Sequence, residues 1–265
     1  MLKKLFFWIA VILIAMWFLT PIVMIFLAAF TPAEDYYNPH KIIPSHLTFE
    51  HLYKLLFLLD GWKSIIISVE VALIAIGLSF LIGLPAGYAM ARYKFKGKRA
   101  INLTILLTRS IPLIVVAVPL IVIYMKVGLS DTVLGVALAH TAMILPFVVL
   151  ITSSIFSGIS VEYEEAGMVF GLTHFQSFVK ITLPLALPGL AASAIYSFIM
   201  SWNEVFVASI LTLTNRTLPA HILNTAMASP DYFKFAAGVM MAVPAMIFIF
   251  FTRKYLISMW GISLK

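Results

Sequence analysis

Three carboxylates gather in the middle of a chain that is otherwise strongly apolar: Glu162, Glu164 and Glu165. They open a polar, helix-prone segment over residues 157–182 that holds no lysine or arginine before Lys180. Carboxylates in the first turn of a helix are stabilised by the helix macrodipole, and ionised carboxylates form strong hydrogen bonds with arginine or lysine of a partner. The residues therefore favour a helix that binds a basic protein surface. The alternative is an amphipathic helix on the bilayer, although such helices typically carry lysine and arginine.

The start of this segment predicts a short helix with one distinctive face. Ser160 is the predicted N-cap, because a serine hydroxyl can accept a hydrogen bond from the first turn. Ala166, Gly167 and Phe170 share one face by their helical spacing. Two small residues and one large residue on that face would suit a groove on a partner.

The end of the segment predicts a turn and a second helix. Gly171 suits the left-handed residue that commonly ends a helix. Thr173 is then expected to cap another short helix. That helix leads to Leu183-Pro184, where a long apolar run begins.

A second constellation, Ser201-Trp202-Asn203-Glu204, interrupts that apolar run. It offers donors and acceptors for hydroxyl groups and a flat ring for stacking, which a sugar-like solute needs. Ionisable groups inside a membrane are costly and are functional candidates for that reason. The alternative is an internal polar network that fixes helix positions. His140, in the preceding apolar run, is expected to be a satisfied donor between helices.

Several kinds of enzyme chemistry have no signature here. The sequence has no G-x-x-x-x-G-K-[S/T] phosphate loop, so any ATP hydrolysis must occur on another chain. It has no cysteine, no metal-spaced histidine and glutamate set, no serine elbow and no dinucleotide fingerprint. We therefore predict no catalytic residue, no metal site and no cofactor on this chain.

Composition fixes the elements that must position these residues. Hydrophobic residues make up 62% of the chain and charged residues 11%, against about a quarter charged in soluble domains. A membrane-spanning helix needs about 20 mainly apolar residues. Gly83 and Gly87, spaced as small-xxx-small, predict a close helix contact. Six segments qualify as spans, over residues 5–30, 64–91, 102–126, 132–156, 184–212 and 235–258.

The distribution of basic residues predicts the orientation, because lysine and arginine gather on the cytoplasmic side of membrane proteins. Five lie in loops on the opposite side: Lys41, Lys54, Lys63, Arg216 and Lys234. Eleven lie at the two ends, in the loop after the second span and in the acidic segment: Lys3, Lys4, Arg92, Lys94, Lys96, Lys98, Arg99, Lys180, Arg253, Lys254 and Lys265. Both termini and residues 157–182 are therefore expected in the cytoplasm, and the net charge of +7 is no sign of a nucleic-acid partner.

The two longer segments on the other side cover about residues 31–63 and 213–234. They are rich in turn residues and aromatics. Ordinary interfacial loops and a docking surface for an external solute-binding protein are both compatible with this pattern.

The acidic segment also follows a known order. Glu165-Ala166-Gly167 precedes Gly171 by the right spacing, and Ile181-Thr182-Leu183-Pro184 follows. This order resembles the cytoplasmic EAA loop of membrane subunits of ATP-binding cassette (ABC) importers. In that family the loop forms a short helix that docks into a groove on the ATPase and passes its motion to the membrane helices. Gly167 and Phe170 depart from the pattern, which commonly has alanine and, in sugar permeases, aspartate.

Other fragments extend the resemblance over nearly the whole chain. They are similar to the maltose-type permeases of carbohydrate ABC importers: Gly87-Tyr88-Ala89-Met90-Ala91-Arg92, Ile111-Pro112, Leu145-Pro146-Phe147, Trp202-Asn203-Glu204, and Arg253-Lys254-Tyr255-Leu256 followed by Gly261 and Lys265.

The resemblance implies an all-α, six-span membrane protein of the type I ABC importer permease fold, with one transmembrane permease domain over residues 1–265. It implies a location in the cytoplasmic (inner) membrane. The partners it implies are a second homologous permease, two ATPase subunits that hold ATP and Mg, an external solute-binding protein and the lipid bilayer. The ATPase-coupling residues it implies are Glu162, Glu164, Glu165, Ala166, Gly167, Phe170, Gly171 and Pro184. Ser201, Trp202, Asn203 and Glu204 are the candidates for the solute path.

The expected solute is a sugar, an oligosaccharide or a polyol. A phosphate ester, an amino acid or a polyamine is the alternative, since the EAA loop is widely shared. A scaffold or sensor subunit and an ion-driven secondary carrier are the remaining alternatives.

Overall fold

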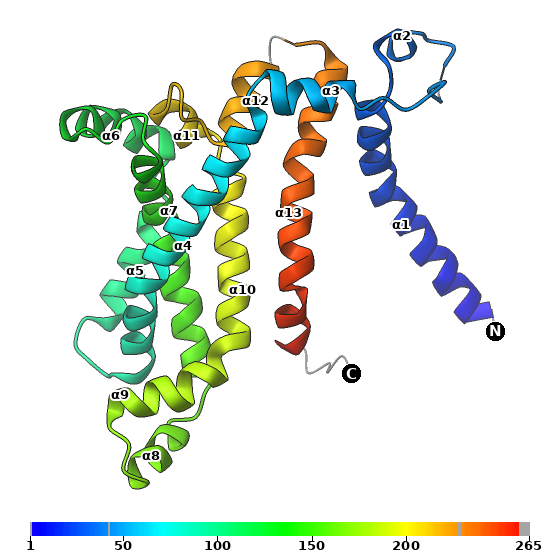
Figure 1. The fold of residues 1–265 in the computed structure, drawn as a ribbon. Helices are drawn as coiled ribbons and strands as arrows, with labels where there is room; N and C mark the ends of the chain where they lie inside the picture. The colour runs from blue at the N-terminus through cyan, green and yellow to red at the C-terminus, as the bar shows by residue number, and fades with distance from the viewer. Residues whose placement is uncertain (1, 42, 227–228, 260–265) are drawn as a thin grey trace. The chain divides into compact units, whose positions relative to one another are not determined.

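A computed structural model of the protein describes the backbone of residues 2–41, 43–226 and 229–259, and the side chains of residues 4–41, 43–225 and 229–250 (Figure 1). Every regular element in these ranges is a helix. Five helices are long and apolar enough to cross a membrane, and a bent pair makes a sixth span if its two helices count as one. The prediction of an all-α polytopic membrane protein is therefore confirmed. Gly261 and Lys265 lie outside the described residues, as do the side chains of residues 253–256.

The described chain divides into two compact units. The first is drawn from residues 1–63 and 221–244, and the second from residues 64–220 and 245–265. The long helices are α1 (Leu2–Ala29), α4 (Gly61–Arg92), α7 (Val133–Ser157), α10 (Leu183–Trp202) and α13 (Asp231–Met259). The shorter helix α12 is Leu218–Ala226.

In the first unit, the segment after α1 folds into short helices rather than an irregular loop. These are α2 (Ala33–Tyr36), α3 (Glu50–Tyr53) and the π-helix η1 (Lys54–Leu58). Asp35 joins distant parts of the segment, because its carboxylate accepts hydrogen bonds from the Lys41 ammonium and from the backbone and hydroxyl of Ser45. Those contacts, above all the one with Lys41, hold the pKa of Asp35 far below its usual value.

In the second unit, glycines bring α4 against α7. A Cβ atom on Gly83 would lie 2.6 Å from Val148 Cγ1, and one on Gly87 would lie 2.0 Å from Thr152 Oγ1. Both distances are shorter than any real contact, so only glycine allows this approach. The predicted small-xxx-small contact is confirmed. Gly189 plays the same part between α10 and α7, because its Cβ would meet Ile155.

The third predicted span is not one straight helix. It consists of α5 (Lys98–Thr108) and α6 (Leu113–Val127), which meet at an angle of 87° (Figure 1). Proline restricts the residue before it and has no N–H to donate, so Pro112 stops one helix and begins the next. The segment predicted as the third span, residues 102–126, is therefore helical on both sides of a break at residues 109–112.

The fifth predicted span, residues 184–212, also divides. Helix α10 ends at Trp202, and a separate helix α11 (Phe206–Leu211) follows. The Glu204 carboxylate accepts hydrogen bonds from the backbone N–H groups of Val207 (2.8 Å) and Ala208 (3.0 Å). These are the unpaired donors that the first turn of any helix leaves, so Glu204 starts a new helix instead of continuing the old one.

Between α7 and α10 the chain forms a compact group of short helices at one end of the second unit (Figure 1). They are α8 (Glu162–Val169), α9 (His174–Ser177) and the π-helix η2 (Phe178–Thr182), which runs directly into α10. These helices occupy the acidic segment singled out in the sequence.

Candidate functional site

Helix α8 begins with the three carboxylates in its first turn, as predicted. The helix starts after Val161, one residue later than a cap at Ser160 would give. The Ser160 hydroxyl nevertheless accepts the N–H of Glu162 at 3.3 Å. The local polar signal was therefore interpreted correctly, with its position one residue out.

Both local signals at the end of the segment are confirmed. Gly171 has a φ of +89°, the left-handed conformation expected of it. The N–H of Gly171 donates to the Met168 carbonyl and the N–H of Leu172 to the Gly167 carbonyl, so a Schellman motif closes α8. Thr173 caps α9 with a reciprocal pair of hydrogen bonds to Gln176. Two rigid short helices with a fixed turn between them result.

The faces of α8 differ from the prediction. Gly167 is buried, because its α-carbon faces Ile181 and Ser177 of the following helices and a Cβ would lie 2.4 Å from Ile181 Cδ1. Phe170 is 88% exposed, and Ala166 is exposed as well. The expectation that Gly167 joins these two in a partner's groove is therefore wrong. Glycine stands here because α8 packs closely on its own chain.

Glu164 is also turned inward, with only 5% of its surface exposed. Its Oε1 accepts hydrogen bonds from Arg92 Nε (2.8 Å) and Thr182 Oγ1 (2.7 Å), and its Oε2 accepts one from the Tyr88 hydroxyl. Arg92 Nη2 lies 2.6 Å from Oε1 as an ion pair without good hydrogen-bond alignment. The expectation that all three carboxylates face a basic partner is therefore wrong for Glu164, which is paired within the chain. Glu162 and Glu165 are exposed.

The charge on Glu164 is secured by these partners. Burial disfavours the ionised form, but the hydrogen bonds from Tyr88, Thr182 and Arg92 and the charge of Arg92 outweigh it. The pKa of Glu164 is held below its usual value, so the carboxylate is ionised at neutral pH.

Arg92 was the residue that sequence reasoning missed. It entered only as one of eleven basic residues on one side of the membrane and as the end of the fragment Gly87-Tyr88-Ala89-Met90-Ala91-Arg92. Its place at the last residue of a span, four residues after Tyr88, was the available signal. Pro184, the last predicted coupling residue, lies in the first turn of α10, directly after η2.

The second constellation proves to be a buried network. His140 Nδ1 lies 2.8 Å from the Ser201 hydroxyl, and His140 Nε2 lies 3.2 Å from Glu204 Oε2. Glu204 is 8% exposed, and its carboxylate also accepts the two hydrogen bonds from backbone N–H groups of α11. The expectation for His140 is confirmed, and for Ser201 and Glu204 the structure supports the alternative of an internal network. We call these three residues the His140–Glu204 cluster.

Trp202 and Asn203 have different surroundings. Trp202 is 1% exposed and its ring stacks on Phe198 at a centroid distance of 5.5 Å, so no face is open to a solute. Asn203 is exposed, and its amide donates to the Ile199 carbonyl at 3.0 Å.

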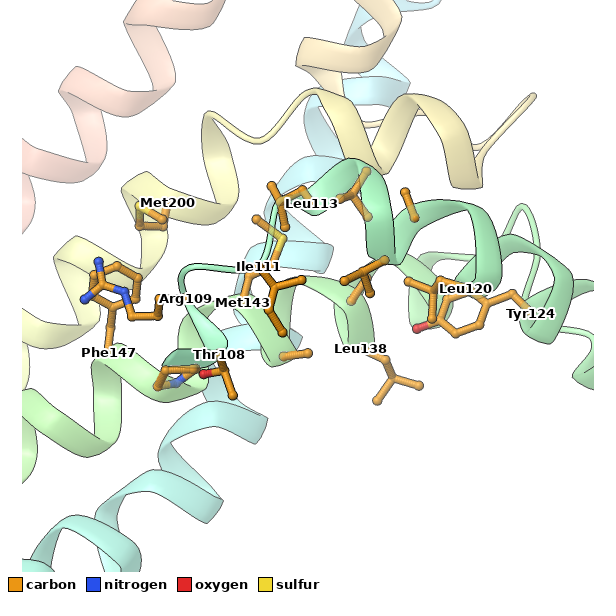
Figure 2. Close-up of a pocket in the computed structure, with 16 residues that line it drawn as sticks. Thr108, Arg109, Ile111, Leu113, Leu120, Tyr124, Leu138, Met143, Phe147 and Met200 are labelled. Carbon is orange, nitrogen blue, oxygen red and sulfur yellow. The ribbon is translucent and has the colours of Figure 1, made fainter. Parts of the chain in front are cut away.

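The second unit contains a cavity of about 440 Å³ beside the break between α5 and α6 (Figure 2). Its wall includes Met200 and Val207 but none of residues 201–204, so the predicted solute-path residues do not line it. Arg109 lies at the cavity, with its guanidinium carbon 3.4 Å from the centre of the Phe147 ring. Most of the remaining wall is aliphatic (Figure 2).

Comparison with known proteins gives concordant results. The family model described as binding-protein-dependent transport system inner membrane component matches residues 83–258. The chain is 31% identical to the trehalose transport system permease protein SugB of Mycobacterium tuberculosis, over 91% of this chain and 89% of that protein. It is 28% identical to the diacetylchitobiose uptake system permease protein DasC of Streptomyces coelicolor, over 88% and 87%.

A solved structure has the same fold. A chain of a bacterial ABC transporter involved in the import of the acidic polysaccharide alginate matches with a TM-score of 0.76, 19% identity and 96% coverage of both chains. The arrangement of helices is therefore the one found in the membrane part of an ABC importer.

Proposed function

Because the chain belongs to the family of binding-protein-dependent transport system inner membrane components, we propose that it is the permease subunit of an importer driven by ATP hydrolysis on separate ATPase subunits. The observation that carries this proposal is the outward face of α8. Glu162, Glu165 and Phe170 are exposed there, while Glu164 and Gly167 are turned inward. The helix is thus held rigidly on one side and open on the other.

The exposed face suits a protein partner better than lipid. Two carboxylates and no lysine or arginine would be repelled by anionic lipid headgroups, whereas a basic groove on an ATPase would pair with them. Tyr163 and Phe170 are 57% and 88% exposed and would supply apolar contact area. The ATP and Mg belong to that partner chain.

The proposed solute is a sugar or an oligosaccharide. Support comes from the relatives, which are named as permeases for trehalose and diacetylchitobiose and align over most of their length. In the proposed assembly, the chain pairs with a second homologous permease, and an external solute-binding protein delivers the solute. Both termini and α8 face the cytoplasm, as the distribution of basic residues indicates.

The test of this function uses the tagged permease expressed with its ATPase, second permease and binding protein. Glu165→Lys reverses a charge on the exposed face of α8, and Gly171→Val forces a β-branched residue to a φ of +89°. Both variants should lose retained ATPase and sugar uptake. Glu34→Lys reverses an exposed charge in α2 and serves as the control for ATPase retention. Wild-type retention and uptake in both α8 variants would refute the assignment.

The orientation has its own test. The chain has no cysteine, so single cysteines can be introduced at exposed Leu47, Lys96 and Phe175. Only the first should react with an impermeant thiol reagent in intact cells. Ser177 is unsuitable, because it is fully buried and donates to the Glu164 carbonyl. Labelling at Lys96 or Phe175 would overturn the proposed orientation.

A further inference from the structure

Three elements of the second unit, α4, α8 and η2, meet at one buried ion pair. Arg92 is the last residue of α4, Glu164 lies in α8, Thr182 ends η2 and Tyr88 lies one turn before Arg92. The side chains of Arg92 and Glu164 are 8% and 7% exposed. We call Tyr88, Arg92, Glu164 and Thr182 the Arg92–Glu164 joint.

Arg92 also holds the end of α7. Its Nη1 donates to the carbonyls of Phe156 and Ile159, each at 2.9 Å. Phe156 lies in the last turn of α7 and Ile159 just after its end, so the guanidinium holds the C-terminal end of α7 and pairs with α8 at the same time. Lysine has a single point charge in place of this planar fork and could not make the same set of contacts.

The apolar floor of the joint is equally specific. The Tyr88 ring lies 4.6 Å from the Phe178 ring and 5.6 Å from the Phe156 ring, centroid to centroid. Phe156 belongs to the core that α7 shares with α10. The joint therefore continues the core of the membrane helices up to the underside of α8.

We propose that Arg92 and Glu164 are positioning residues that clamp α8 to the ends of α4 and α7, so that a push on α8 moves three long helices together. Helix α10 follows through the chain itself, by way of η2, while α4 and α7 follow through the joint. Glu164 acts through Arg92 and does not contact the ATPase. This inference rests on the proposed function, since it concerns how the movement of a docked ATPase reaches the membrane.

Neighbouring carboxylates on α8 give a matched pair of variants. Glu165→Gln alters the exposed face and should loosen the ATPase. Glu164→Gln leaves that face unchanged, so the ATPase should stay bound while the solute imported per ATP hydrolysed falls. Because the clamped joint is the same in both states, its loss favours neither state and instead weakens the transfer of each movement of α8 to α4 and α7. The readout is uptake and ATP hydrolysis by the same complexes in vesicles, normalised to retained ATPase.

A second measurement does not depend on how well a variant folds. Spin labels at Lys94 and Val161, both exposed and neither assigned to the docking face, report the distance between the end of α4 and the start of α8 in the otherwise wild-type complex. A clamped joint predicts the same distance distribution without nucleotide and with bound ATP.

The possible outcomes separate the two proposals. If Glu164→Gln loses the ATPase as Glu165→Gln does, or imports as much solute per ATP as wild type, the joint is refuted. A label distance that changes on ATP binding refutes it independently. If wild-type permease itself retains no ATPase, the proposed function has failed.

Discussion

Two glutamates are buried in the part of the chain that the structure describes, and they are held in opposite ways. Glu164, in the Arg92–Glu164 joint, faces a permanent cation and two hydroxyl groups that come from other elements. Glu204, in the His140–Glu204 cluster, faces a histidine and two backbone N–H groups only three and four residues ahead. Their exposed fractions are nearly equal, 5% and 8%.

The difference shows that burial alone does not define the role of a carboxylate. Glu164 binds Tyr88 and Arg92, which lie 76 and 72 positions before it in the sequence. It therefore fixes the position of one helix relative to another. Glu204 shapes its own neighbourhood, where it ends one helix and starts the next. Variants that treat the two sites alike should therefore have unequal effects.

Removing the cation should give the largest effect. Arg92→Met leaves the Glu164 carboxylate buried without a counter-charge and removes the hydrogen bonds to the Phe156 and Ile159 carbonyls, at a cost of about 3–5 kcal/mol. His140→Leu should cost less, because two backbone donors still hold Glu204. Thermal unfolding of the purified permease in detergent measures both. Adding Glu164→Leu to Arg92→Met should recover part of the lost stability. If Arg92→Met and His140→Leu lowered the unfolding temperature equally, the two buried glutamates would not differ in the way described.

Neutralising Glu204 should have an intermediate effect. In Glu204→Gln the amide offers a single acceptor oxygen to two N–H donors, and an unsatisfied buried donor costs about 1–3 kcal/mol. Hydrogen exchange at Val207 and Ala208 should accelerate, and the unfolding temperature should fall. If sugar preference changed while exchange and unfolding temperature did not, the cluster would belong to the solute path after all.

Acidification should remove the contribution of Glu164. Because its folded-state pKa lies below the usual 4.5, its ion pair stabilises the protein fully above that value, and the stabilisation is lost as pH falls through the lower, folded-state pKa. Wild type should therefore exceed Glu164→Gln in unfolding temperature at pH 7, and the gap should shrink steadily towards pH 3. A gap that does not depend on pH would show that the charge is irrelevant.

Single hydroxyl deletions should show the smallest contrast. Tyr88→Phe removes a hydrogen bond to a charged carboxylate, worth about 1.5–3 kcal/mol, and Ser201→Ala removes one to an imidazole, worth about 0.5–1.5 kcal/mol. The aromatic ring at position 88 and the His140 ring keep their other contacts. The fall in unfolding temperature therefore compares the two hydrogen bonds directly. If Ser201→Ala lowered the unfolding temperature more than Tyr88→Phe, the His140–Glu204 cluster would contain the stronger hydrogen bond and the expected order would be wrong.

Local signals in the sequence predicted local structure well. The turn at Gly171 and the cap at Thr173 depend on a few adjacent residues, and six apolar stretches located the long helices. The break before Pro112 was missed because the apolar composition continues through it, although Arg109 and Ser110 beside the proline marked the place.

The direction in which α8 faces could not be obtained in this way. Helical spacing places Glu164 and Gly167 on one face, but it does not say that this face is the buried one. That depends on Arg92, 72 positions earlier, and on Ile181 in the following helix. For Glu204, the sequence left two interpretations open, a solute path and an internal polar network. The contact with His140, 64 positions away in another helix, supports the network.

Helix α4 has a further consequence because of its length. Its 32 residues measure about 48 Å, against about 30 Å for the hydrocarbon layer. A helix with such hydrophobic mismatch tilts in a thin bilayer and straightens in a thick one. Since Arg92 is its final residue, we expect lipid chain length to shift the guanidinium relative to the headgroups. Because Arg92 binds Glu164 of α8, membrane thickness would then change the position of α8 relative to the membrane surface, with no change in any soluble partner.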